Sequence, residues 1–199
     1  MMEHHIAEPL DDGRYKALIL LAIPSAVLSI AGSTAIIYMV CAKKTRRWTP
    51  YTRLLLCMSI CDIILSVHLA MGSFMRPEAT SNRPWAVGNE ATCAFSGWVG
   101  QLSLSANLYN AALSFYFLFS ARFRMKDNTI ARWVEPFMHT VAIGYPLATA
   151  TIGAVFGFFS EPELGLGCGV NDYPRNCGEG PGKTGEICLS IVSEKFYLL

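Results

Sequence analysis

Charged side chains are scarce in this sequence, in which Asp, Glu, Lys and Arg together make up 16% of the 199 residues. A soluble globular domain carries about 25% charged residues. Hydrophobic residues, by contrast, account for 52% of the chain. This balance argues against a soluble domain and favours a membrane protein.

Motifs that would indicate other classes of protein are also missing. The sequence has no zinc-type C-x-x-C pair, no phosphate-binding glycine loop and no Ser/His/Asp arrangement, so neither a metal site nor an enzyme is predicted. No basic patch interleaved with aromatic residues suggests nucleic acid. An N-x-Ser/Thr sequon is absent too, so N-glycosylation is not expected.

Long apolar runs are what the chain does contain. They span residues 17–42, 54–75, 93–120 and 133–159. At about 1.5 Å per residue, each run can cross a hydrocarbon core of about 30 Å as a helix. Residues 1–16 read as a polar tail, and residues 160–199, rich in Gly and Pro, as a loop-like end. The sequence predicts an all-α protein with four transmembrane helices, integral to the plasma membrane or another endomembrane.

The basic residues give these helices a direction. Lys and Arg are concentrated in the short loops that follow the first and third runs, at Lys43, Lys44, Arg46, Arg47 and Arg53 and at Arg122, Arg124, Lys126 and Arg132. The other loops carry fewer over much longer segments. Since cytoplasmic loops are enriched in Lys and Arg, the amino terminus is predicted to lie outside.

This orientation determines on which side of the membrane each cysteine lies. It places Cys93, Cys168, Cys177 and Cys188 on the oxidising side, where they allow three pairings that the sequence does not distinguish. A bridge from Cys93 to one of the later cysteines would tie the outer end of the third helix to the loop beyond the fourth. Such a bridge closes a long loop and is worth about 4 kcal/mol in the chain-entropy model.

One carboxylate lies deep in the second helix. Asp62 is about 12 Å from the inner end by helix rise, and Ser59 and Ser66 share its face. A charge at that depth points into a bundle interior and marks an ion, proton or substrate path. The alternative is a structural aspartate that hydrogen-bonds to serine and asparagine neighbours.

Polar residues also form a stripe on the third helix, at Ser103, Asn107, Asn110 and Ser114. Because lipid cannot satisfy polar groups, this face is expected to contact protein or water. We predict a cluster of Asp62, Ser33, Asn107 and Asn110, which either holds a hydrated Na⁺ through hard oxygen ligands or forms an interhelical hydrogen-bond network. On the fourth helix, Glu135 and His139 are four apart and can pair.

Several of these residues resemble motifs of one receptor family. Cys93 opens the third helix and is followed by cysteines after the fourth, and Asp62 ends an L-x-x-x-D pattern in LLLCMSICD. Trp85 and Gly88 form W-x-x-G before Cys93, while Gly32-Ser33 is similar to the G-N-x-x-V of a first helix. In order and topology, the chain resembles the front half of a seven-transmembrane, rhodopsin-like G-protein-coupled receptor of the divergent protist or algal type.

The resemblance covers roughly residues 20–188 and implies both a ligand and a partner. It implies a disulfide from the third helix to the second outer loop, sodium at Asp62, and signal transduction from an unknown extracellular ligand to a heterotrimeric G protein in the full-length form. The chain departs from the family at FSARFRM, where D-R-Y is missing and Arg122 and Arg124 are the candidates to face the G protein. Helices five to seven are absent, so the chain alone is not expected to signal.

Two other classes remain open from the sequence. An ion or proton transporter or channel subunit would use Asp62 and His68 as part of a path. A four-span membrane scaffold would carry its large cysteine loop between the third and fourth helices, whereas that loop is short here.

Overall fold

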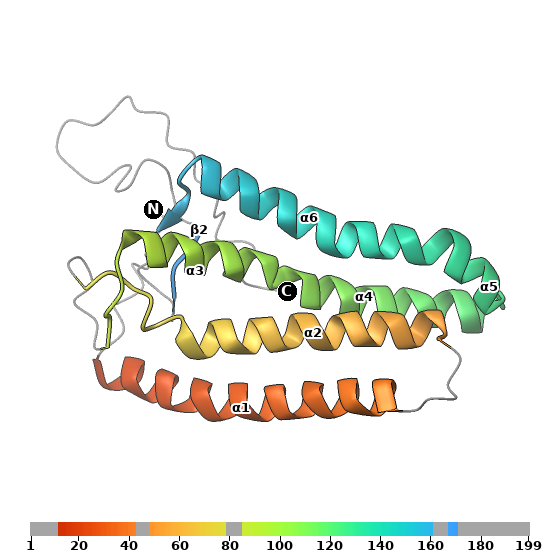
Figure 1. Ribbon diagram of the computed structural model, residues 1–199, viewed down its shortest axis with the longest axis horizontal. Helices are drawn as coiled ribbons and strands as arrows, with labels where there is room; N and C mark the ends of the chain where they lie inside the picture. The colour runs from red at the N-terminus through yellow and green to blue at the C-terminus, as the bar shows by residue number, and fades with distance from the viewer. Residues whose placement is uncertain (1–11, 43–47, 79–84, 161–166, 171–199) are drawn as a thin grey trace, which may run out of the picture.

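The computed structural model describes residues 12–42, 48–78, 85–160 and 167–170. The described chain is mostly helical, and its long helices run roughly antiparallel in a row, with α1 at one edge and α6 at the other (Figure 1). Their bounds are α1 Asp12–Ala42, α2 Pro50–Met71, α3 Glu90–Leu102, α4 Leu104–Phe117 and α6 Glu135–Val155. Between α4 and α6 lie the π-helical turn η1 (Leu118–Arg122), the short α5 (Asp127–Thr129) and the π-helical turn η2 (Ile130–Val134).

The first two helices pack along a single seam. Small and apolar residues of α1 are buried at a spacing of seven, at Ile19, Ala26, Ser33 and Val40. A repeat of seven keeps one narrow stripe against a neighbouring helix, here α2, while the rest of α1 exposes apolar side chains. The segments Gly13–Ala42 and Pro50–Met71 are each long and apolar enough to cross a membrane.

The predicted third helix is divided at Ser103. Its hydroxyl donates to the Gly100 carbonyl at 2.6 Å, and α3 and α4 continue nearly in line on either side of it (Figure 1). The helix also begins earlier than expected, because Asn89 and Thr92 cap each other's backbone N–H groups in a capping box. With 13 and 14 residues, α3 and α4 are each too short to cross a bilayer alone.

The helix α6 ends at Val155, before the expected Phe159, and a glycine sets this end. Gly157 adopts a left-handed φ of 69°. The Phe158 N–H donates to the Gly153 carbonyl at 2.9 Å and the Gly157 N–H to the Ala154 carbonyl at 3.3 Å. These two bonds form a Schellman motif, which turns the chain sharply off the helix.

We expect Gly157→Ala to lower the free energy of unfolding by about 1 kcal/mol, because a side chain disfavours the left-handed conformation. The matched control is Gly144→Ala, in the exposed interior of α6, where an added Cβ meets only the Thr140 methyl at 4.0 Å. That variant should stabilise the helix by a few tenths of a kcal/mol to about 1 kcal/mol. Thermal and denaturant unfolding in detergent measures both, and equal effects of the two variants would contradict the role of the left-handed turn.

After this turn the chain folds back across α3. Strand β1 (Phe159–Ser160) pairs antiparallel with β2 (Gly169–Val170), and Cys168 forms a disulfide with Cys93 of α3. The Phe159 ring lies between two glycines, because a Cβ on Gly97 of α3 or Gly153 of α6 would come within 2.7 or 2.8 Å of it. Gly153 and Gly157 form a G-x-x-x-G pattern in the sequence, and here one glycine seats an aromatic ring while the other ends the helix.

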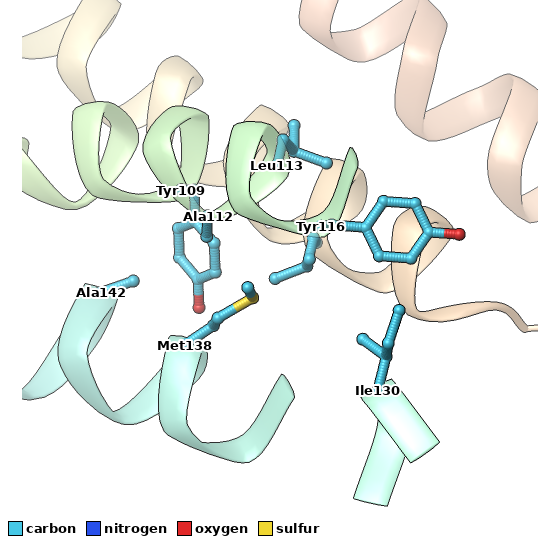
Figure 2. Packing of buried hydrophobic residues seen from close by; sticks show 8 residues of the cluster. Tyr109, Ala112, Leu113, Tyr116, Ile130, Met138 and Ala142 are labelled. Carbon is cyan, nitrogen blue, oxygen red and sulfur yellow. The ribbon is translucent and has the colours of Figure 1, made fainter. Parts of the chain in front are cut away.

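The largest buried cluster lies in the other half of the molecule, where α2, α4, η2 and α6 meet. Figure 2 shows the Tyr109 ring of α4 pointing toward Met138 and Ala142 of α6, and the Tyr116 ring lying near Ile130. The cluster comprises Leu54, Tyr109, Ala112, Leu113, Tyr116, Ile130, Met138 and Ala142. This packing determines which face of α4 is buried.

Candidate functional site

Asp62 is held between α1 and α2 by two serine hydroxyls. Ser33 donates to Asp62 Oδ2 at 3.0 Å, and Ser29 donates to the same oxygen at 3.4 Å. The two serines are four residues apart on α1, so both face α2, and Ser33 is 5% exposed. Of the residues expected around this carboxylate, the structure thus brings Ser33 to Asp62, and it adds Ser29.

The other residues predicted for this cluster make no hydrogen bond to Asp62 among the described contacts. Ser59 is buried, but its hydroxyl donates to the Leu55 carbonyl at 2.9 Å. Asn107 and Asn110 are exposed on α4, and among the described residues neither side chain hydrogen-bonds to Asp62. The predicted cluster of Asp62 with these two asparagines is therefore not formed, because α4 buries its tyrosine face against α2 and α6 instead.

These contacts bear on the two interpretations of Asp62. Carboxylate and hydroxyl oxygens are hard ligands that suit a small cation, but the two asparagines expected to complete the set do not lie beside Asp62. The observed contacts are those of the hydrogen-bonded alternative. The sodium ion stays a prediction.

We expect Ser33→Ala to lower the free energy of unfolding by about 1 kcal/mol, since it removes the shorter hydrogen bond to a part-buried carboxylate. Ser25→Ala is the matched control, because Ser25 is exposed on the same helix and donates only to the Ala22 carbonyl. The measurement is the midpoint of unfolding in detergent.

The same measurement across a sodium titration tests the ion. A bound Na⁺ would raise the midpoint of the native chain with sodium concentration, and Asp62→Asn would abolish the dependence. A native midpoint that does not respond to sodium, as in Asp62→Asn, would contradict a sodium site.

A second polar cluster joins α2, α4 and α6 beside the buried core. Arg53 donates through Nε and Nη2 to the two carboxylate oxygens of Glu135, both at 2.5 Å, and through Nη1 to the Trp48 carbonyl at 3.2 Å. The Glu135 side chain is 6% exposed, whereas that of Arg53 is 36% exposed. A two-point guanidinium–carboxylate pair fixes both the distance and the orientation of two helices.

His139 extends this cluster from α6 to α4. His139 Nε2 lies 3.5 Å from Glu135 Oε1, so the pair expected from the four-residue spacing is present. His139 Nδ1 also hydrogen-bonds to the hydroxyl of Tyr109 at 2.8 Å. We call Arg53, Glu135, His139 and Tyr109 the Arg53–Glu135 network.

Sequence reasoning had missed two members of this network. The sequence places Arg53 among the loop cations and indicates no role for Tyr109. The position of each residue along its helix was the available signal. Arg53 lies at the start of the apolar run of α2, and Glu135 lies at the start of the apolar run of α6. A cation at the same height on a neighbouring helix is one way to compensate a carboxylate that borders an apolar run.

The remaining predicted residues are placed as follows. Cys93 pairs with Cys168, whereas Cys177 and Cys188 lie outside the described residues. Arg122 ends the η1 turn and Arg124 has a φ of 50°, and both are exposed beyond the C-terminal end of α4. His68 packs against Gly100, where an added Cβ would come within 2.8 Å of its Nε2. Within the described ranges, no three His, Cys, Asp or Glu side chains are grouped closely enough to hold a metal ion.

Comparisons with protein-family models, with curated proteins and with solved structures find no match.

Proposed function

We propose that this chain is an integral membrane protein of receptor-like architecture, with four spans and its amino terminus outside. In its full-length form it transduces a signal from an extracellular ligand to a heterotrimeric G protein. The helices α1 and α2 supply two of the spans, α3 followed by α4 supplies the third, and η2 with α6 supplies the fourth.

The disulfide is the observation that carries this proposal. Cys93 begins the α3–α4 pair, and Cys168 follows the turn after α6. Two cysteines that are joined lie on the same side of a membrane, so the chain between them crosses it an even number of times. One outward-to-inward crossing by α3 and α4 and one return crossing by α6 satisfy this condition. The pairing also agrees with the outer-loop disulfide of the receptor family.

Aromatic side chains support the same placement. Tryptophan is enriched at both membrane–water interfaces. Trp48 is 57% exposed beside α2 and Trp133 is 71% exposed in η2, both at the basic end of the helix row. Trp85, which is 43% exposed, lies toward the opposite end, before the disulfide-bonded end of α3.

The contacts of Asp62 support a receptor-like arrangement of the first two helices. The motif residues Asp62 and Ser33 are placed on adjacent helices and hydrogen-bond to each other. In the family, the corresponding aspartate couples to activation. We propose that Asp62 has that role here, with Arg122 and Arg124 on the surface that faces the G protein.

Glycosylation mapping tests the topology. Since the chain has no sequon of its own, every N-linked glycan on a variant reports the inserted site. We expect sequons placed in residues 1–11 or 171–199 to be glycosylated in microsomes, and those in residues 43–47 or 123–128 to remain bare. A glycan at either of the latter positions would contradict the four-span orientation.

The transcript tests the receptor function. We expect the reading frame beyond Leu199 to encode three further apolar helices, including C-W-x-P and N-P-x-x-Y elements. Independent transcripts and genomic sequence that both stop at Leu199 would contradict the seven-helix form. Expression of the 199-residue chain alone should then give no second-messenger response.

A further inference from the structure

The segment that joins α4 to α6 carries exposed cations on the surface of the molecule. Exposed basic side chains occur at Arg122, Arg124, Lys126 and Arg132. The one acidic residue among them is Asp127, which accepts a hydrogen bond from the Tyr116 hydroxyl at 3.1 Å. We call residues 122–133 the basic inner segment. Its surface is strongly positive, with four cations against one engaged carboxylate.

The basic inner segment is anchored to the buried core. Ile130 is fully buried, and Met125 packs partly buried against the same cluster. The Met125 N–H donates to the Phe119 carbonyl at 3.1 Å, and the Ile130 N–H to the Lys126 carbonyl at 3.1 Å. With the backbone held at these points, the cations are presented at set positions, which reduces the entropy lost when they engage an anionic surface.

An exposed tryptophan sets the depth of this segment in a bilayer. Trp133 is 71% exposed, and Phe137, which is one turn further along the helix, is 69% exposed. The Arg132 guanidinium lies 5.7 Å from the centre of the Trp133 ring. Because tryptophan sits at the level of lipid headgroups, a cation over its ring lies beside the headgroup phosphates.

We propose that the basic inner segment binds the headgroups of anionic phospholipids in the adjacent leaflet, an inference that rests on the proposed four-span topology. Phosphate and carboxylate groups complement its charge, and the exposed Trp133–Phe137 face continues from the cations toward the hydrocarbon. An acidic segment of a soluble protein would match the charge but would leave this apolar face uncovered. Each cation near an anionic surface raises the affinity about fivefold.

Quenching of Trp133 by brominated lipid tests the proposal. The full chain carrying Trp48→Phe, Trp85→Phe and Trp98→Phe retains Trp133 alone. It is placed in bilayers of mixed phosphatidylserine and phosphatidylcholine, with bromine on the serine lipid in one sample and on an equal amount of the choline lipid in the other. We expect the brominated serine lipid to quench Trp133 more strongly, and the difference to shrink as salt is raised.

Charge variants provide the controls. Replacing Arg122, Arg124, Lys126 and Arg132 by Gln should make the two lipids quench equally, whereas Arg122→Lys/Arg124→Lys should keep the preference. Arg14→Gln/Lys16→Gln, which removes two exposed cations from the far end of α1, should leave it unchanged. If the two lipids quenched Trp133 equally in the chain that keeps all four cations, lipid selection would be overturned while the topology stayed intact. No quenching by either lipid would contradict the fourth span itself, and the inference with it.

Discussion

Replacing Cys93 by serine should lower the free energy of unfolding by about 4 kcal/mol. The disulfide with Cys168 closes a loop of 75 residues, and the chain-entropy model assigns this stabilisation to a loop of that length. The bridge also holds β2 and the buried Phe159 against α3, so its loss frees the segment that folds back over this end of the molecule. The shift in unfolding midpoint in detergent, under oxidising conditions, measures the effect.

The control for this variant is Cys41→Ser, because Cys41 is a free and exposed cysteine at the end of α1. It should change the midpoint little. A reducing agent should bring the native chain to the midpoint of Cys93→Ser and leave that variant unaffected. If reduction lowered both midpoints equally, a bond other than Cys93–Cys168 would carry the stabilisation.

Arg53→Met should cost about 3 kcal/mol, the second largest effect that we expect. It leaves the Glu135 carboxylate, only 6% exposed, without the guanidinium that satisfies both of its oxygens. Breaking a fully buried ion pair by removing one partner costs about 3–5 kcal/mol, and the partial exposure of Arg53 places this pair at the lower end. Denaturant unfolding measures the change.

A double-mutant cycle separates the pair from the burial of its members. Arg53→Met/Glu135→Leu removes both charges, so it should recover most of the stability that Arg53→Met loses. The matched control is Arg14→Met, because Arg14 is an exposed arginine on α1. If the effects of Arg53→Met and Glu135→Leu measured singly added up to that of the double variant, the ion pair would contribute nothing beyond its separate side chains.

Helix positions followed from the sequence where the signal is local. The apolar runs of α1 and α2 predicted helices that the structure confirms as long and apolar enough to span a membrane. The division at Ser103 was not predicted, since serine inside an apolar run gives no composition change. The end of α6 was placed too late, although Gly157 in GxxxG was the available sign of a left-handed helix end.

The site residues were predicted in part, for a similar reason. Ser33 and Asp62 were grouped correctly because both lie on helices joined by a short loop, at matching depth. Glu135 and His139 needed only their four-residue spacing. The burial of Tyr109 in place of Asn107 depends on how α4 rotates against two other helices, and the polar stripe alone does not fix that rotation. The Arg53–Glu135 pair joins residues 82 positions apart, beyond the reach of any local pattern.

The order of synthesis determines when the Cys93–Cys168 bond can form. Cys93 leaves the ribosome well before Cys168, because 75 residues separate them. In the proposed topology, Cys168 enters the oxidising compartment only after α6 has been inserted. Until then Cys93 is a thiol exposed to oxidases and to other cysteines of the nascent chain. The redox state of Cys93 during biogenesis therefore reports whether insertion of the last described helix is complete.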